Sequence, residues 1–293
     1  MVDLHMHSIA SLDGTYSAKE LIDFALKANL EYMAICDHDE VSSIDEASEY
    51  AKANNIRFIK GIEISTIMDK HPLHILGYNI DHHDPRFSTR SKYVQECTKL
   101  WAVQAIRKTQ EFGFSCDADE IFAIAKNGIV CEENIGEIVL NDQRNDKDER
   151  LLPFREGGKL SDNPTFNFYK TFFSPNGPLY IEYDFNLPLS ETAKLIKETG
   201  GKMFLAHPAY NIGLNEDLLK QIISFGLDGI EVFSSYHDAQ AVSFYYDMAK
   251  KYDLHMSVGS DFHGALKPSI KMGSIDYDHD ELDRTLKFLG VKQ

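Results

Sequence analysis

The chain has few of the features that mark secreted, membrane-spanning or disulfide-stabilised proteins. It contains only four cysteines among 293 residues, none of them in a CxxC pair, so neither a zinc ribbon nor a dense disulfide framework is expected. No run of about 18 apolar residues is present to cross a bilayer, and the first residues lack the basic start and apolar stretch of a secretory signal. These absences predict a cytoplasmic protein with reduced thiols and no membrane partner.

Basic side chains are also scarce. Thirty lysines and arginines stand against 46 aspartates and glutamates, which gives a formal net charge of -16. Such a charge repels a long polyphosphate backbone, so a nucleic-acid scaffold is disfavoured and no long nucleic acid is expected as a partner. A small anionic substrate stays compatible, because bound cations can dominate the local field. The composition gives no indication of the oligomeric state.

Short apolar runs alternate with amphipathic ones at both ends of the chain, which is typical of a β/α fold. Strands are predicted at residues 2–7, 32–36, 57–64, 73–80, 203–208, 229–233 and 255–261. Helices are predicted between them at residues 17–30, 44–55, 190–201, 215–226 and 238–252. The pattern predicts seven strands in one barrel-like domain made of residues 1–84 and 175–293.

Residues 85–174 show a different pattern. A long helical periodicity covers 86–113, and shorter helical pieces follow at 118–126 and 133–142. Residues 145–164 are charged and contain glycine and proline, which favours a mobile loop. The sequence therefore predicts an inserted helical cap over residues 85–174.

Histidines and carboxylates recur where the predicted strands end. In barrels of parallel strands, the loops at the carboxyl ends of the strands converge on one face, so side chains at these positions are expected to meet. The candidates in chain order are His5, His7, Asp37, His38, Asp39, Glu63, His74, His207, Glu231, His237, Asp261 and His263.

Each of these features has an ordinary structural explanation when it is taken alone. The His5–His7 pair can arise by chance, and the aspartates around His38 can cap a helix. His74 can be a satisfied core histidine, and His207 before a proline can belong to a turn. Together, however, so many buried carboxylates and imidazoles at one barrel mouth are costly without counter-ions, which favours a metal centre.

The mixture of ligands indicates which ions suit the centre. It lacks a thiolate, and carboxylates mixed with imidazoles suit zinc, manganese or iron. The candidates are too many for one ion. The sequence therefore predicts two or three divalent ions close together, with a bridging carboxylate and a metal-bridging hydroxide as the attacking group.

Several motifs in chain order resemble the PHP family, the polymerase and histidinol phosphatase superfamily of metal-dependent phosphoesterases. These motifs are HMHSIASLDGT, ICDHDEVSS, GIEIS, HILGY, AHP and GSDFHGALKP, over about residues 1–84 and 188–275. The resemblance implies a distorted (β/α)7 TIM-like barrel with a trinuclear metal site.

The resemblance also implies how the ligands are shared among three ions. The first ion would take His5, His7, Glu63 and Asp261. The second would share Glu63 and add His74 and His207, and the third would take Asp13, His38 and His263.

The branch of the family with an insertion between the fourth and fifth strands resembles this chain most. Its members act on 3',5'-nucleoside bisphosphates or short RNA ends, which implies a phosphatase or phosphoesterase acting on a small phosphorylated metabolite such as a nucleotide. That branch carries an arginine after the His-Pro of the fifth strand, where this chain has Ala209, Tyr210 and Asn211. It also carries an Arg-x-His in the cap, where Asn134 takes the histidine position.

The missing arginine removes a planar group that binds phosphate through two hydrogen bonds at once. Candidates for supplying positive charge are Arg144, Arg150, Arg155 and Lys267, with a solvated surface role as the alternative for the arginines. The predicted substrate contacts are Tyr210, Asn211, Ser235, His237 and Lys267, and His237 is also a candidate general acid. For Ser235 and His237 the alternative is the start of the following helix.

Two other functions are compatible with these residues. An amidohydrolase-type metal hydrolase would use the same kind of centre on a carbonyl substrate, although no lysine stands at a ligand-bearing strand end. A barrel that binds metal or nucleotide without catalysis is the third alternative, which a complete ligand set disfavours.

Overall fold

A computed structural model describes residues 1–125, 128–182 and 185–291 of the chain and divides it into two compact units. Unit 1 consists of residues 1–91, 186–263 and 269–293, and unit 2 of residues 92–185 and 264–268. The predicted insertion at 85–174 therefore starts seven residues before the boundary at 92 and ends before the boundary at 185. Most of α3 (Pro85–Glu111), from residue 92 onward, lies in unit 2, as does a short segment after the last strand.

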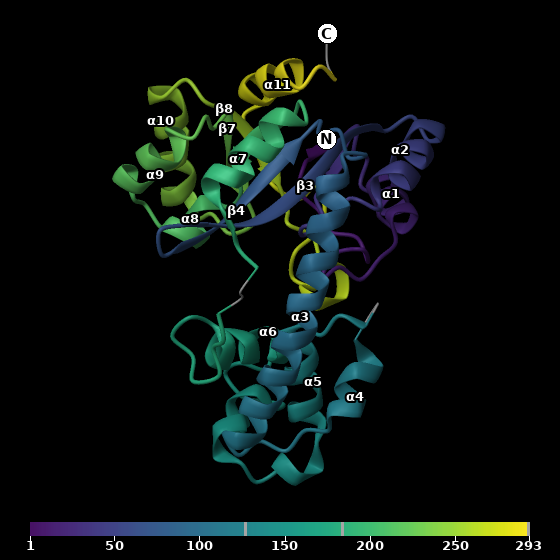
Figure 1. The fold of residues 1–293 in the computed structure, drawn as a ribbon, viewed down its shortest axis with the longest axis vertical. Helices are drawn as coiled ribbons and strands as arrows, with labels where there is room; N and C mark the ends of the chain where they lie inside the picture. Colours follow the sequence, from purple (N-terminus) through teal and green to yellow (C-terminus); the bar gives the residue numbers. More distant parts are fainter. Residues whose placement is uncertain (126–127, 183–184, 292–293) are drawn as a thin grey trace. The chain divides into compact units, whose positions relative to one another are not determined.

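Unit 1 is a nearly closed barrel whose strands alternate with helices (Figure 1). Its strands are β1 (Val2–Asp3), β2 (Tyr32–Ile35), β3 (Arg57–Met68), β4 (His71–Tyr78), β5 (Leu187–Pro188), β6 (Lys202–Leu205), β7 (Gly229–Ser234) and β8 (His255–Gly259). Its helices, besides the start of α3, are α1 (Ala18–Lys27), α2 (Ile44–Ala53), α7 (Leu189–Glu198), α8 (Pro208–Ile212), α9 (Glu216–Ile223), α10 (Ala239–Lys251) and α11 (His279–Phe288). The order β1-β2-β3-β4-β6-β7-β8 confirms the distorted seven-stranded barrel, and β5 pairs only with β3.

The fourth strand runs against its neighbours, which the assumption of parallel strands missed. β4 pairs antiparallel with both β3 and β6, while the other pairs along the barrel are parallel. The cause is local: only Asp69 and Lys70 separate β3 from β4, and Asp69 adopts the left-handed conformation with φ of 54°. Two residues can join only antiparallel neighbours. His74 therefore lies opposite Ser65 of β3 rather than at the carboxyl end of a parallel strand.

The apolar side chains of unit 1 form two core clusters between the strands and the surrounding helices. One core cluster includes Ile62, Ile64, Phe204 and Met256 beneath α7, α9, α10 and α11. A second cluster places Leu21 of α1 and Ala47 of α2 against β2. Helix α1 begins with the capping box formed by Ser17 and Glu20.

Unit 2 is helical, and its core is rich in phenylalanine. Besides the C-terminal part of α3, it contains α4 (Ala118–Ile124), α5 (Glu132–Asn141), α6 (Pro164–Phe168), a π-helical turn η4 (Tyr169–Phe173) and 3-10 turns η2 (Gln143–Asn145), η3 (Glu149–Phe154) and η5 (Gly264–Leu266). Phe114, Phe168 and Phe172 form contacts with ring centroids 4.7–5.9 Å apart. The predicted helix at 118–126 ends earlier in the structure, and its last residue, Lys126, lies outside the described residues.

The charged stretch at 145–164 differs from the loop that its composition suggested. Its Leu151 and Phe154 are buried in the core of unit 2. Arg150 lies over the rings of Phe112 and Phe114, so its aliphatic stem and its charge both contact the core. Two buried apolar side chains and two cation-π contacts therefore tie to the core a segment that composition alone marks as polar.

The barrel closes between its first and last strands. The backbone amide of Leu4 donates to the carbonyl of Val258 at 2.9 Å, and that of Asp261 donates to the carbonyl of His5 at 2.8 Å. The buried carboxylate of Asp3 accepts hydrogen bonds from the backbone amides of Ser260 (2.9 Å), Gly273 (2.9 Å) and His5 (3.4 Å). This side chain therefore joins β1 to the segment after β8.

We predict that Asp3→Ala lowers the free energy of unfolding by about 2–4 kcal/mol, because it leaves backbone donors without an acceptor in a buried site. Asp3→Asn keeps a carbonyl acceptor and should lose less. Urea unfolding curves, monitored by circular dichroism, give the free energy of unfolding of both variants. An alanine variant as stable as the parent chain would show that this carboxylate does not hold the closure.

Candidate metal centre

The side chain of Glu63 is the middle of the site. It points from β3 into the barrel rim and is fully buried. Imidazole nitrogens surround both of its oxygens at 2.9–3.2 Å: those of His74 and His207 lie at Oε1, and those of His5, His7 and His38 at Oε2. One carboxylate among five imidazoles is suited to bridge cations.

Glu63 and three neighbouring side chains form one close group. Nε2 of His7 lies 3.2 Å from Nε2 of His5 and 2.8 Å from Oδ1 of Asp261, and Nε2 of His5 lies 3.3 Å from that oxygen. Ligands bound at 2.0–2.2 Å around a tetrahedral ion are about 3.4 Å apart. His5, His7, Glu63 and Asp261 therefore have nearly the spacing of one coordination shell.

The neighbouring group contains Asp13, His38 and His263. Nε2 of His263 lies 2.8 Å from Oδ2 of Asp13, and Nε2 of His38 lies 3.7 Å from the same oxygen. The ring of His7 stacks on both histidines, with centroids 4.1 Å and 4.5 Å apart. The structure thus brings together all the side chains predicted as metal ligands: His5, His7, Asp13, His38, Glu63, His74, His207, Asp261 and His263.

Hydrogen bonds at the opposite ring nitrogens orient four of the histidines. Nδ1 of His5 lies 3.0 Å from Oε1 of Glu231, and Nδ1 of His7 lies 3.2 Å from Oγ of Ser11. Nδ1 of His207 lies 2.8 Å from Oδ1 of Asn211, and Nδ1 of His263 lies 2.7 Å from the carbonyl of Asp261. When Nδ1 donates in each pair, Nε2 offers its lone pair toward the centre.

Three buried atoms in this cluster make no hydrogen bond of acceptable geometry among the described residues, although each lies within 3.2 Å of a polar atom across the Glu63 carboxylate. They are Nδ1 of His38, Nδ1 of His74 and Oε2 of Glu63. Buried polar atoms without partners are costly, and a cation placed among these three would satisfy all of them. The donor set therefore fits divalent metal ions.

The protonation of the cluster is strongly perturbed. Burial alone would lower the pKa of His7, but the hydrogen bonds to Asp261 and Glu63 outweigh it and raise this pKa to about 9. Burial dominates at His38 and lowers its pKa to about 3. Burial opposes ionisation of Glu63, yet the surrounding imidazoles hold its pKa well below its usual range. A metal ion that binds His7 must therefore displace a proton.

The two aspartates beside His38 hold its loop. Asp37 accepts hydrogen bonds from the backbone amide and hydroxyl of Ser8 and from the hydroxyl of Ser43. The carboxylate of Asp39 forms a buried ion pair with Arg90, with Nε to Oδ1 at 3.0 Å, and Arg90 also donates to the carbonyl of Ser65. These aspartates fix the loop and do not cap α2, whose first turn follows Ser43.

The backbone at the rim is strained at two candidate ligands. His207 and Asp261 have backbone φ angles of 24° and 56°, a region that residues other than glycine rarely adopt. Gly259 is required nearby, since a Cβ there would lie 1.9 Å from Oε1 of Glu231. Backbone strain at His207 and Asp261 therefore accompanies the orientation of their side chains toward the centre.

The predicted substrate contacts have different surroundings. Tyr210 is half exposed beside His207, with ring centroids 5.9 Å apart, and Ser235 is exposed at the end of β7. Asn211 bonds to His207. Nδ1 of His237 lies 2.8 Å from the carbonyl of Val232, and its Nε2 accepts from the backbone amide of Ala209. These bonds occupy both ring nitrogens of His237 inside the protein, and Lys267 belongs to unit 2.

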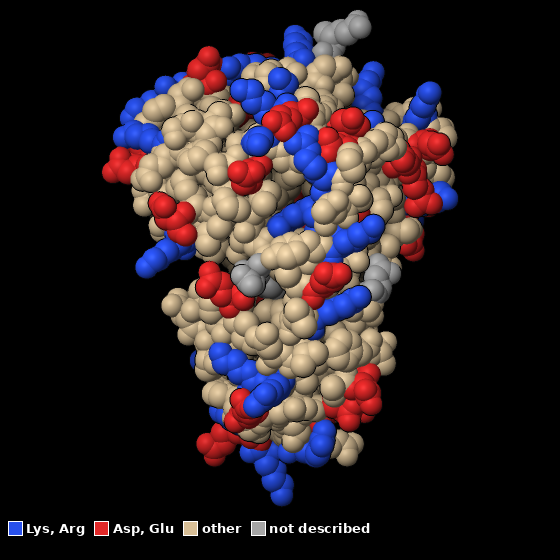
Figure 2. All heavy atoms as spheres, in the orientation of Figure 1, with Lys and Arg blue, Asp and Glu red and all other residues tan. Residues whose placement is uncertain are grey.

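The arginines proposed to supply charge are paired within unit 2. Arg144 pairs with Asp142, Arg150 with Asp148, and Arg155 with Asp146 at 3.3 Å. Asn134, at the position of the family's histidine, accepts from the backbone amide of Cys131 at the start of α5. On the face that Figure 2 shows, basic and acidic side chains are interspersed rather than gathered into one basic field.

Sequence reasoning missed several supporting side chains. The hydroxyl of Tyr236 donates to Oδ2 of Asp261 at 2.7 Å, and Arg90 stands behind the loop of His38. Glu231 was a candidate ligand at the end of a predicted strand, but nothing in the sequence showed that it hydrogen-bonds to His5 and to the backbone amide of His207. No motif spacing reveals these roles, because each depends on packing between distant segments.

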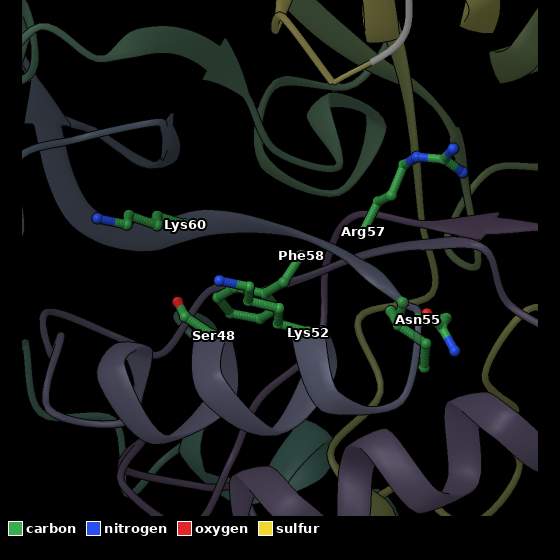
Figure 3. A pocket seen from close by; sticks show the side chains of 7 residues that line it. Ser48, Lys52, Asn55, Arg57, Phe58 and Lys60 are labelled. Atoms are coloured by element: carbon green, nitrogen blue, oxygen red, sulfur yellow. The ribbon is translucent and has the colours of Figure 1, made fainter.

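A hollow of about 670 Å³ lies elsewhere in unit 1, between α2 and the start of β3 (Figure 3). It is lined by Ser48, Lys52, Asn55, Ile56, Arg57, Phe58 and Lys60. None of these is a predicted ligand, so this hollow is separate from the cluster around Glu63.

Comparisons with known proteins agree with the geometry. Residues 3–139 match the family model of the PHP domain. The chain is 29% identical to a 5'-3' exoribonuclease from Haemophilus influenzae over 89% of each protein. It is 27% identical to a 3',5'-nucleoside bisphosphate phosphatase from Chromobacterium violaceum over 89% of this chain and 87% of the relative.

A solved structure has the same fold. It is described as an amidohydrolase from Chromobacterium violaceum with bound sulfate and no metal, and it superimposes with a TM-score of 0.80 at 24% identity, over 98% of this chain and 96% of that one. The chain therefore contains a PHP domain, and the ligand cluster and the curated relatives indicate a hydrolase of the metal-dependent phosphoesterase type.

Proposed function

We propose that the chain hydrolyses a phosphate ester of a small nucleotide, such as a nucleoside 3',5'-bisphosphate or the end of a short RNA. The observation that carries the proposal is the buried Glu63 carboxylate with five imidazoles around it at 2.9–3.2 Å. The relatives named a bisphosphate phosphatase and an exoribonuclease support the substrate class.

Two or three divalent ions, of manganese, zinc or iron, are the proposed cofactors. His5, His7, Glu63 and Asp261 would hold the first, and the other ligands the rest. When bound, such ions bind phosphoryl oxygens, neutralise developing charge and lower the pKa of water. No membrane partner is proposed; within the described residues, no helix combines the length and apolar character needed to cross a bilayer.

The chain's own residues prepare this rim in two ways. Glu231, Ser11 and Asn211 orient the imidazoles so that their Nε2 atoms face inward. The Tyr236 hydroxyl donates to Asp261 and directs its other oxygen toward His7. Both ring nitrogens of His237 hydrogen-bond to backbone groups, so we do not propose His237 as the general acid that protonates the leaving group.

An aromatic pair beside the rim suits a nucleobase. The rings of Tyr210 and Tyr236 are 5.3 Å apart and tilted by 41°, and both lie edge-on to the ring of His207. Tyr210 is 50% exposed, so part of this residue is accessible to a ligand from solvent. Stacking on an aromatic side chain contributes about 1–3 kcal/mol per base, and this is where the family's arginine is missing.

The barrel-rim centre is tested first with His7→Ala. Loss of one ligand at the centre should lower phosphate release from a nucleoside 3',5'-bisphosphate by at least about 1000-fold and should lower the manganese content of the protein. The matched control is His71→Ala, which changes an exposed histidine at the start of β4. Full activity of His7→Ala with unchanged metal content would overturn the proposal.

Removal of metal is expected to abolish activity reversibly. Dialysis against a chelator should reduce phosphate release to background and lower the melting temperature, because carboxylates and imidazoles lose their counter-ions. Manganese should restore both quantities. The same holoprotein is assayed on amides and lactones, and turnover of these with none of phosphate esters would favour the amidohydrolase alternative.

Tyr210→Ala is expected to raise the KM for a nucleoside bisphosphate by about tenfold, in line with the loss of one stacking contact. The KM for ribose 5-phosphate should stay the same, since that substrate has no base. Tyr210→Phe retains the ring and serves as the control. An equal change for both substrates would show that Tyr210 does not recognise the base.

A second candidate is stepwise removal of nucleotides from the 5' end of a short RNA. The relative from Haemophilus influenzae, named a 5'-3' exoribonuclease, favours it. The net charge of -16 opposes long RNA. Competition between a 5'-phosphorylated hexamer and a nucleoside bisphosphate separates the two, since the preferred substrate has the higher kcat/KM.

A further inference from the structure

A second group of ligating side chains lies in unit 1, apart from the cluster around Glu63. It consists of Asp45 in the first turn of α2 and of His82 and His83 in the turn between β4 and α3. None of the three was a candidate ligand from the sequence, and the proposed phosphoesterase reaction does not use them.

The nitrogen atoms of both histidines converge on one carboxylate oxygen. Nε2 of His82 lies 2.8 Å from Oδ1 of Asp45, and Nε2 of His83 lies 3.8 Å from the same atom. Ligand atoms around a tetrahedral zinc ion are about 3.4 Å apart. The two distances lie on either side of this value, so small side-chain rotations would bring the three atoms to bonding positions.

The side chain of His82 is held by burial, whereas the exposed side chains of Asp45 and His83 are free to change rotamer. The side chain of His82 is 4% exposed, and its ring lies 4.0 Å from the ring of His83. The turn is held by hydrogen bonds from the backbone amides of His83 and Asp84 to Asp81. The side chains of Asp45 and His83 are 68% and 69% exposed, which leaves room for a water molecule as fourth ligand.

The local charge is mixed. The hydrogen bond with His82 holds the pKa of Asp45 below its usual range, and the nearby charges of His83 and Lys60 act in the same direction. Figure 3 shows Lys60 extending from β3 past Ser48 of α2. The ammonium group of Lys60 weakens cation binding, so moderate rather than tight affinity is expected.

We infer that Asp45, His82 and His83 form an outer site for one divalent transition-metal ion. Two imidazoles and one carboxylate with an open position match Zn²⁺ best. The bound ion would tie the start of α2 to the turn that precedes α3. This inference does not depend on the proposed phosphoesterase activity, because the two sites share no residue.

The test uses the full chain and Zn²⁺ alone at pH 7.5. After equilibrium dialysis against micromolar zinc, elemental analysis should find one more zinc ion per chain in the parent protein than in His83→Ala or Asp45→Asn. Both substitutions change exposed side chains, so the fold should persist, and buried His82 is left intact. His279→Ala, at an exposed histidine of α11, is the matched control and should bind as the parent does.

Hydrogen exchange locates the extra ion. Zinc should slow backbone exchange several-fold in residues 44–53 and 79–87 of the parent chain, and this slowing should be absent in His83→Ala. Zinc bound only at the barrel rim would be retained equally by all variants. Equal zinc content in parent and variants, or unchanged exchange in these two segments, would overturn the outer site.

Discussion

The burial of the Glu63 carboxylate is the constraint on which the barrel rim depends. A charged group without solvent contact needs compensating charge on every side, and five imidazoles provide it within 3.2 Å. These imidazoles come from four separate segments of unit 1, since His5 and His7 lie only two residues apart. The positions of those segments are therefore coupled through one side chain, and an ion at the centre would strengthen that coupling.

The hairpin of β3 and β4 shows how backbone geometry serves this cluster. Because β4 runs antiparallel to β3, His74 reaches Oε1 of Glu63 from the neighbouring strand, with Nδ1 2.9 Å away. An isolated parallel β-bridge between the backbones of His38 and Glu63 aligns the loop after β2 with β3. Arg90 holds that loop through its ion pair with Asp39, so the first turns of α3 support the loop that carries the candidate ligand His38.

Much of the rim could be predicted because metal ligation restricts residue type. His5, His7, Glu63 and His74 stood out as histidines and acids on the predicted strands, and the family resemblance added Asp13. The partners that orient them could not be predicted: Ser11, Glu231 and Tyr236 are common residue types whose roles depend on which distant segment lies beside them.

The fold was predictable to a similar depth. Periodicity located the seven barrel strands, but it carries no information about direction, and the reversal of β4 followed from a two-residue turn at Asp69. Composition misjudged residues 145–164, because Leu151 and Phe154 are buried in the core of unit 2 and Leu160 and Arg150 pack against it. A few buried side chains outweigh many exposed ones in deciding whether a segment is ordered.

The central claim is that imidazoles and carboxylates from distant segments hold divalent ions at this rim. Anomalous diffraction from crystals grown with manganese tests it most directly. The account predicts anomalous peaks within bonding distance of Glu63 Oε2 and of the Nε2 atoms of His5 and His7. Crystals that diffract well but show no anomalous density among these side chains at saturating manganese would contradict it.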